Sequence, residues 1–196
     1  MIRNVGIFLF DEVEVLDLAG PFEVFSTASR LEHPAKRFEV FTVADALRTV
    51  RARGGLMVQA NYDFTNHPQI DVLIVPGGVV TSELKCQPTI EWIRRTAATA
   101  ELTASVCTGA FLLAQAGLLA NRSITTHWED VEEFKSMFPH ISVQPENRWI
   151  DTGKVVTSAG ISAGMDMSLH LVSRLSGEAL ALRTARQMDY DWRRSS

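Results

Sequence analysis

Runs of consecutive apolar residues constrain the fold of this chain more than any other feature of its sequence. Residues 5–10 form such a run, and residues 70–75 form another that only Asp71 interrupts; both are short and rich in residues that favour strands. A strand that is apolar on both faces must be covered on both faces, as in a parallel sheet between two layers of helices. Segments with helical character alternate with the strand-like runs, at 11–30, 89–100 and 163–175. We therefore predict an α/β fold with a doubly wound, mostly parallel sheet covered by helices on both faces.

The remaining elements follow from the same patterns. We expect further helices at 108–116, 127–137 and 178–190, a hairpin or edge ribbon at 50–60, and further strands at 38–43, 102–106, 123–126 and, as a pair, within 143–158. Within the first helical segment, Pro21 cannot donate a backbone hydrogen bond to the preceding turn. We predict that a short helix ends near Ala19 and that a second helix begins at Pro21.

Length and composition limit the classes of function. The chain has 196 residues, of which 46% are hydrophobic and 21% charged, so we expect a single domain over residues 1–196. A net charge of -4 argues against a nucleic-acid-binding surface, and we interpret Arg48, Arg51 and Arg53 as a solvated edge. No apolar run reaches the roughly 20 residues that span a bilayer, and the N-terminus leads straight into a strand. We expect no membrane partner and a cytoplasmic location.

Cysteine and histidine spacing indicates neither a disulfide framework nor a metal site. The chain has two cysteines, Cys86 and Cys107, and five histidines without an H-x-x-x-H or H-x-H pattern. We expect no metal and a reducing compartment. Cys86 lies in a polar stretch without a turn motif around it, so we expect it to have no functional role.

Cys107 stands at a predicted strand-to-helix turn. Ser105 and Gly109, two positions before and after it, are the small residues that a strained nucleophile elbow requires. Since the N-terminus of a helix favours an anion, we expect the sulfur to be held as a thiolate, the nucleophile of covalent catalysis. The alternative interpretation is a small core residue. The strand ends at 76–78 and 158–160 should meet Cys107 at one edge of the sheet.

Five motifs in one order along the chain resemble the ThiJ/PfpI family of the class I glutamine amidotransferase-like superfamily. They are the segments 17–25 (DLAGPFEVF), 75–78 (VPGG), 106–110 (VCTGA), 125–128 (TTHW) and 158–164 (SAGISAG). The resemblance implies a flavodoxin-like fold. Within the family the chain looks most like isonitrile (isocyanide) hydratases, which it also resembles in the closing segment 187–190 (QMDY).

Three related groups fit less well. Glutamine amidotransferases carry a His-x-Glu pair that segment 158–164 lacks, and protease-like members have a histidine where this chain has Thr108. Transcriptional regulators add a helix-turn-helix module, whereas only six residues follow Tyr190 here. We therefore expect an enzyme of the hydratase type.

The resemblance assigns the catalytic roles to three residues. It makes Cys107 the nucleophile and Asp17 the general acid and base, placed over the sulfur. A carboxyl that shares a small apolar pocket with a thiolate should have a raised pKa, because burial and the like charge both disfavour its ionised form. The backbone N–H groups of Thr108 and Gly78 should stabilise an anion, and the Thr108 hydroxyl should orient Asp17. Helix capping is the alternative role for Asp17 and for Thr108.

The pocket should be completed by residues near these strand ends. Gly77, Gly78, His127 and Ile161 are candidates for substrate binding, with turn glycines and a structural histidine as the alternatives. Phe22 and Trp128 also qualify, although large apolar residues are more often core. Asp166 should cap or brace its helix.

The function implied is a cofactor-free lyase that hydrates isonitriles to N-substituted formamides through a thioimidate on Cys107. The expected partners are a small-molecule substrate and a second copy of the chain in a homodimer, with His127 at the subunit interface. Two alternatives remain open: a redox-responsive protective protein whose cysteine is oxidised, and a glyoxalase-type hydrolase of small carbonyl compounds.

Overall fold

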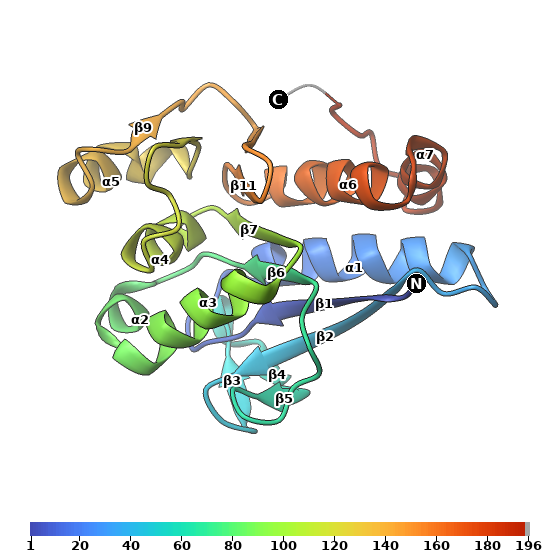
Figure 1. The fold of residues 1–196 in the computed structure, drawn as a ribbon, viewed down its shortest axis with the longest axis horizontal. Helices are drawn as coiled ribbons and strands as arrows, with labels where there is room; N and C mark the ends of the chain where they lie inside the picture. Colours follow the sequence, from blue (N-terminus) through green and yellow to red (C-terminus); the bar gives the residue numbers. More distant parts are fainter. Residues whose placement is uncertain (195–196) are drawn as a thin grey trace.

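A seven-stranded sheet forms the centre of the computed structural model, which describes residues 1–194 (Figure 1). Only the contact between β10 and β11 is antiparallel, and the other neighbouring strands are parallel. From one edge to the other, the strands are β10 (Trp149–Asp151), β11 (Val155–Ser158), β7 (Leu102–Val106), β6 (Val72–Val75), β1 (Arg3–Phe8), β2 (Phe38–Ala44) and β5 (Tyr62–Asp63).

Helices cover the sheet in two groups. Helices α1 (Val15–Leu31), α6 (Ala163–Ser176) and α7 (Glu178–Gln187) pack against one another, and helices α2 (Thr81–Lys85), α3 (Gln87–Thr99) and α4 (Gly109–Gln115) form the second group (Figure 1). The predicted doubly wound α/β fold is therefore confirmed.

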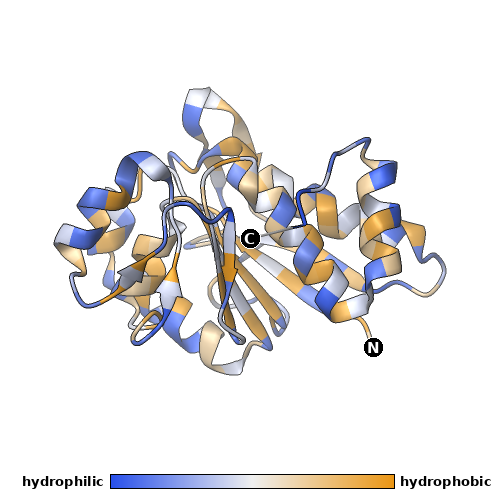
Figure 2. Ribbon diagram, turned by 90° about the horizontal axis from the view of Figure 1, so that it is seen from above, coloured by the Kyte–Doolittle hydropathy of each residue, from blue (hydrophilic) through white to orange (hydrophobic). Residues whose placement is uncertain are grey.

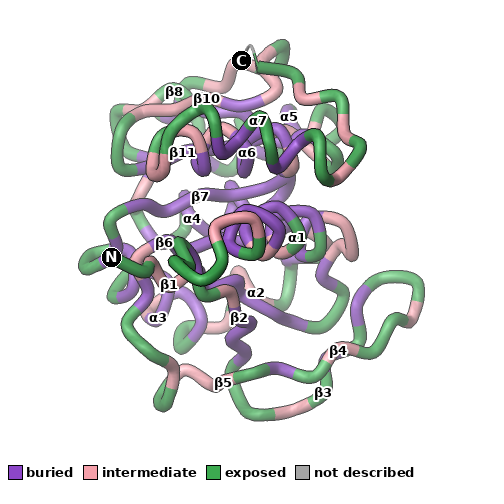
Figure 3. Tube along the Cα trace, turned by 90° about the vertical axis from the view of Figure 1, so that its right-hand side faces the viewer, coloured by how far each residue is buried: buried purple, intermediate pink, exposed green. Residues whose placement is uncertain are grey.

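The core lies where the continuous apolar runs were found. All four residues of β6 and all five of β7 are buried, and the central strands are hydrophobic and enclosed (Figures 2 and 3). Burying a Val, Leu or Ile side chain contributes roughly 1.5–3 kcal/mol, so these strands stabilise the sheet on both faces. Within residues 1–194 no helix is both long and apolar enough to cross a membrane.

The predicted helix break at Pro21 is wrong. Helix α1 runs unbroken from Val15 to Leu31 with Pro21 inside it, although an internal proline costs about 3 kcal/mol. Packing offsets this cost, since α1 packs against β2, α6 and α7. A side chain at Gly20 would lie 2.9 Å from Met165 Cγ of α6. Gly20 therefore permits a close contact between α1 and α6.

Smaller elements surround the sheet. Strands β3 (Thr49–Arg51) and β4 (Met57–Gln59) form the predicted hairpin around a short 3₁₀ turn, η1 (Arg53–Gly55). The strand expected at 123–126 is shorter, β8 (Ser123–Ile124), and pairs with β9 (Ser142–Val143) outside the main sheet. Strand β8 ends at Ile124 because the next residue bonds other segments: the Thr125 N–H donates to Thr157 Oγ1, and the Thr125 hydroxyl donates to Asn147 O. Helix η2 (Trp128–Asp130) and helix α5 (Val131–Met137) follow.

Candidate active site

Cys107 lies at the end of β7 on a sharp turn into α4. Its φ of 57° is in the left-handed region, which non-glycine residues rarely adopt. Two hydrogen bonds hold this conformation: Cys107 N–H donates to Ser158 O at 3.1 Å, and Thr126 Oγ1 donates to Cys107 O at 2.9 Å. A side chain at Gly109 would overlap the Val75 carbonyl oxygen, which explains the small residue after the cysteine.

Asp17, in the first turn of α1, lies next to Cys107 and is fully buried. Its Oδ2 accepts a hydrogen bond from Gly77 N–H at 3.1 Å. Its Oδ1 is buried and has no hydrogen-bond partner of ordinary geometry among residues 1–194. Burial raises the pKa of Asp17 to about 7, against the lowering effects of the Gly77 N–H and the Cys107 thiol. At neutral pH, Asp17 therefore holds a proton part of the time.

The thiol of Cys107 is not held as a thiolate by the helix, contrary to the sequence expectation. Burial raises its pKa, and the negative charge of Asp17 raises it further, while the Thr108 backbone N–H lowers it. Desolvation outweighs this lowering effect, because the Cys107 residue is only 6% exposed. Two neighbouring buried acids favour a single shared charge, so the pair can combine one proton with one anionic group.

The Thr108 hydroxyl and the Gly78 backbone bond each other, whereas the Thr108 backbone N–H acts on the Cys107 sulfur. The Thr108 hydroxyl donates to Gly78 O, and Gly78 N–H donates to the same hydroxyl, both at 2.9 Å. The expectation that this hydroxyl orients Asp17 is therefore wrong, and the Gly78 N–H is not available to an anion. The two hydrogen bonds instead fix the loop after β6 against the elbow.

A cavity of about 320 Å³ opens onto the sulfur. Of the predicted site residues, Cys107, Thr108, Gly78, His127 and Ile161 line it. The other predicted residues lie elsewhere: Asp17 and Gly77 are behind the elbow, Phe22 lines a different hollow, and Trp128 is 70% exposed outside the lining. Asp17 therefore meets the cavity at the Cys107 sulfur, with which its carboxyl interacts.

His127 lies close to the sulfur, as expected. A side chain at Gly160 would overlap the His127 ring and lie 3.1 Å from Cys107 Sγ, so both groups border the same glycine. His127 Nε2 is 3.6 Å from Glu129 Oε2, and Nδ1 is buried without a hydrogen-bond partner in the described part of the chain. Nδ1 packs against Gly160, and the ring contributes to the lining of the cavity.

Charged residues of the cavity were missed by the sequence interpretation. Glu14, Arg53 and a carboxylate cluster line it, the cluster being Glu129, Asp130 and Glu133. Arg53 is solvated, as expected, with 53% of its side chain exposed, but η1 also carries it to the cavity, where it pairs with Glu14 at 3.2 Å. Nothing in the sequence marks these surface-type residues. Thr126 was missed as well, although it stands beside His127 in the 125–128 motif.

Asp166 is a structural residue, in agreement with the prediction. It is fully buried, and its Oδ2 accepts a hydrogen bond from Arg148 Nε at 2.8 Å. Its Oδ1 accepts from the backbone N–H of Arg193, which ties the C-terminal segment to α6.

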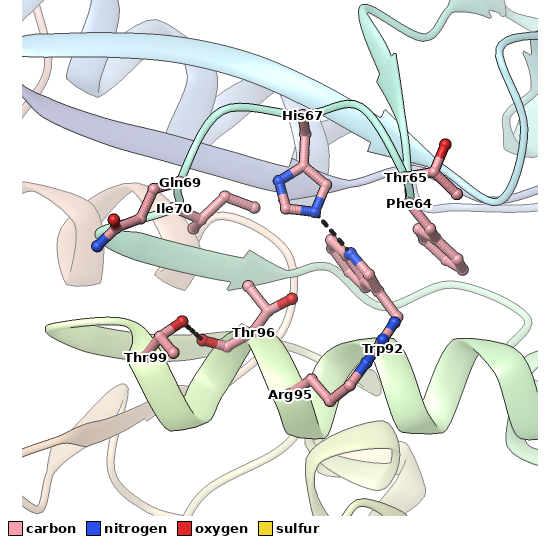
Figure 4. A pocket seen from close by; sticks show the side chains of 9 residues that line it. All are labelled: Phe64, Thr65, His67, Gln69, Ile70, Trp92, Arg95, Thr96 and Thr99. Atoms are coloured by element: carbon pink, nitrogen blue, oxygen red, sulfur yellow. Dashed lines mark hydrogen bonds between the residues drawn. The ribbon is translucent and has the colours of Figure 1, made fainter.

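A second cavity, of about 300 Å³, lies between the 64–70 loop and α3 (Figure 4). Trp92 Nε1 donates to His67 Nε2 at 3.0 Å, and His67 Nδ1 lies 2.8 Å from Pro68 O (Figure 4). Both ring nitrogens of His67 are therefore paired. Among the described residues, the lining of this second cavity contains no cysteine, aspartate or glutamate. The cavity at Cys107 is thus the candidate active site.

Comparisons with known proteins agree with the motifs. The model of the DJ-1/PfpI family matches residues 3–174. An isonitrile hydratase of Pseudomonas putida is 33% identical over 97% of this chain and 79% of its own length. The transcriptional regulator GbdR of Pseudomonas aeruginosa is 29% identical over 96% of the chain, which spans only 51% of that protein. The crystal structure of a ThiJ/PfpI family protein from Pseudomonas syringae superimposes with a TM-score of 0.84, at 25% identity, over 97% of this chain and 76% of that one.

Proposed function

This chain belongs to the DJ-1/PfpI family, and from that premise we propose that it hydrates isonitriles to N-substituted formamides at Cys107. One observation carries the proposal: the fully buried Asp17 stands against Cys107, the only thiol among residues 1–194 that lines the cavity. The similarity to an isonitrile hydratase along nearly the whole chain supports the same reaction.

The first step adds sulfur and hydrogen to one carbon. The terminal carbon of an isonitrile carries a lone pair, which accepts the proton of the Asp17–Cys107 pair. Cys107 Sγ then forms a bond to this carbon, and the product is a thioimidate in which the carbon is doubly bonded to nitrogen. The pair supplies one nucleophile and one proton, and this addition consumes both. Asp17 is left as the carboxylate.

Water completes the reaction in the second step. It adds to the thioimidate carbon while the Asp17 carboxylate, now the general base, accepts one of its protons. The carbon–sulfur bond breaks, the nitrogen gains a proton, and the formamide leaves. Of the two protons of water, one is now on the formamide nitrogen and the other is on the Asp17–Cys107 pair, which again shares one proton; one water is therefore consumed for each isonitrile.

The residues around the pair hold it in place. The Thr126 hydroxyl fixes the Cys107 carbonyl, and the paired Thr108 and Gly78 hold the loop that positions Gly77. Gly77 N–H in turn binds Asp17 Oδ2, which leaves Oδ1 for the proton. Preorganisation of this kind lowers the cost of aligning the acid and the nucleophile.

Incubation of the purified chain with a simple alkyl isonitrile tests the proposal. Formamide should form with the wild-type chain and with Cys86→Ser, and should be absent with Cys107→Ala. The Cys86 variant is the matched control, since it removes the other cysteine without touching the cavity. No formamide above the Cys107→Ala background would eliminate the proposed reaction.

The alternatives from the sequence give different outcomes in two further assays. A redox-responsive protein needs a readily ionised thiol, whereas burial raises the pKa of Cys107. Mild peroxide should therefore leave Cys107 largely unoxidised by mass spectrometry. Selective sulfinic acid at Cys107 without turnover would favour the redox function, and turnover of methylglyoxal would favour a glyoxalase-type enzyme.

A further inference from the structure

The cavity at Cys107 carries an excess of negative charge. Four carboxylates line it, those of Glu14, Glu129, Asp130 and Glu133, against one guanidinium, that of Arg53. Arg53 is already paired with Glu14. Within residues 1–194, Glu129, Asp130 and Glu133 form no ion pair with a lysine or arginine. We call these three residues the acidic rim.

The field of the acidic rim extends into the cavity. Burial raises the pKa of Asp130, and the charges of Glu133 and Glu129 raise it further, against the opposing effects of His127 and Arg53. The charge of Asp130 also contributes to the raised pKa of the Cys107 thiol. Asp130 is half-buried, whereas Glu129 and Glu133 are exposed, so the field of the rim acts on a charged molecule that approaches the sulfur and is weakened by salt.

Two further features point to a bound ligand. The Asp17 side chain is fully buried beside Cys107 with Oδ1 unpartnered among residues 1–194, which marks the reacting end of the site. Trp128 lies outside the cavity lining but precedes Glu129 in η2; its indole is 70% exposed, and its ring lies 5.7 Å from the ring of His127, which does line the cavity. An exposed indole beside carboxylates is a combination that binds substituted ammonium groups.

We propose that the natural substrate carries a cationic group, a substituted ammonium, which the acidic rim binds while the isonitrile carbon faces Cys107. This inference rests on the proposed hydratase function. The cavity volume of about 320 Å³ is at the lower end for small-molecule sites, so both groups belong to one small molecule. A substrate with a carboxylate at the same position is repelled.

Three isonitriles of matched chain length test the charge preference: one ending in trimethylammonium, one in a methyl-terminated neutral chain and one in a carboxylate. At low ionic strength, kcat/KM should be highest for the cationic and lowest for the anionic compound, with at least about a tenfold ratio between them. Added salt should reduce this ratio. Equal values for the three compounds, with good turnover, would overturn the charge preference and leave the hydratase function intact.

Variants of the rim locate the effect. In Glu129→Gln/Asp130→Asn/Glu133→Gln, the ratio of cationic to anionic kcat/KM should fall towards one. The ratio is the informative quantity, because a change in sulfur reactivity affects both substrates alike. Glu132→Gln is the matched control: Glu132 neighbours Glu133 on α5, but its side chain is 86% exposed and lies outside the cavity lining. An unchanged ratio in the triple variant would refute the role of the rim.

A second readout needs no isonitrile turnover. In a Cys86→Ser background, a cationic trimethylammonium methanethiosulfonate and an anionic sulfonate analogue form a disulfide with Cys107 and release sulfinate. Once each rate is divided by the rate of the same reagent with a free small thiol, mass spectrometry should show at least about tenfold faster modification by the cationic reagent. This preference without any formamide would refute the hydratase function while supporting the selectivity of the cavity for cations. Faster modification by the anionic reagent would refute the selectivity.

Discussion

Replacing Asp17 by Asn should stabilise the folded chain at alkaline pH, although Asp17 is the proposed acid. The side chain is fully buried, and burial raises its pKa from 3.8 to about 7. Asparagine has almost the same shape, its amide oxygen can accept the Gly77 N–H, and it brings no charge into the interior. The gain therefore comes from removing the cost of burying a carboxylate.

The pH dependence follows from proton binding. Between pH 3.8 and about 7, the folded chain keeps a proton on Asp17 that the unfolded chain has lost, so the stability of the wild type falls as pH rises through this window. The whole shift corresponds to about 4 kcal/mol, which is the upper limit of the gain for Asp17→Asn at pH 8. For a chain of this size, that equals an increase in Tm of about 8–16 °C. Below pH 4 the gain should nearly vanish.

Urea unfolding of both proteins at pH 4, 6 and 8 measures the difference. Asp166→Asn is the control, since Asp166 is equally buried but paired with Arg148, and its loss should cost about 3–5 kcal/mol at pH 8. The reasoning is refuted if Asp17→Asn is less stable than the wild type at pH 8, or if its gain is the same at pH 4 and pH 8.

Three further predictions concern the elbow and the reaction. The kcat/KM of the wild type should rise with pH through about 7, as the Asp17–Cys107 pair loses its first proton, and Asp17→Asn should lose this inflection together with at least about a hundredfold in kcat/KM. In urea unfolding, Gly109→Ala should lower the free energy of unfolding by about 3 kcal/mol or more, because the added methyl group overlaps Val75 O. The control Gly117→Ala should lower it by only about 1–2 kcal/mol, because Gly117 has a positive φ but open space around it. Thr126→Val should lower the free energy of unfolding by about 1–3 kcal/mol and should also lower kcat, because the buried Cys107 carbonyl loses its hydrogen-bond donor. An unchanged kcat would contradict the role of Thr126 in positioning Cys107.

The sheet and the elbow were predictable because they follow from local patterns. Continuous apolar runs can only be buried on both faces, so they indicate central parallel strands. The small residues around Cys107 are required wherever a strand turns sharply into a helix, as the overlap at Gly109 shows. The failure at Pro21 has the opposite cause. Proline does have a low helix propensity, but the packing of α1 against α6 and α7 outweighs it.

The charge state and the lining of the site depended on distant segments. Whether the Cys107 thiol ionises depends on how deeply the fold buries it beside Asp17, 90 positions earlier in the chain. The acidic rim consists of exposed-type residues on η2 and α5, and Arg53 reaches the cavity from the β3–β4 hairpin. Hydrogen-bond partners such as Thr108 and Gly78 were equally unpredictable, because several donors and acceptors compete at one edge of the sheet.

The sequence by itself determined the family, the doubly wound fold and the position of Cys107 at a strand-to-helix turn, because each is encoded in contiguous residues. Only the tertiary structure decided the protonation of the Asp17–Cys107 pair and the charge around it. The physical reason is that desolvation and Coulomb interactions depend on burial and on distances in three dimensions. Residues far apart in the chain contribute to both as much as sequence neighbours do.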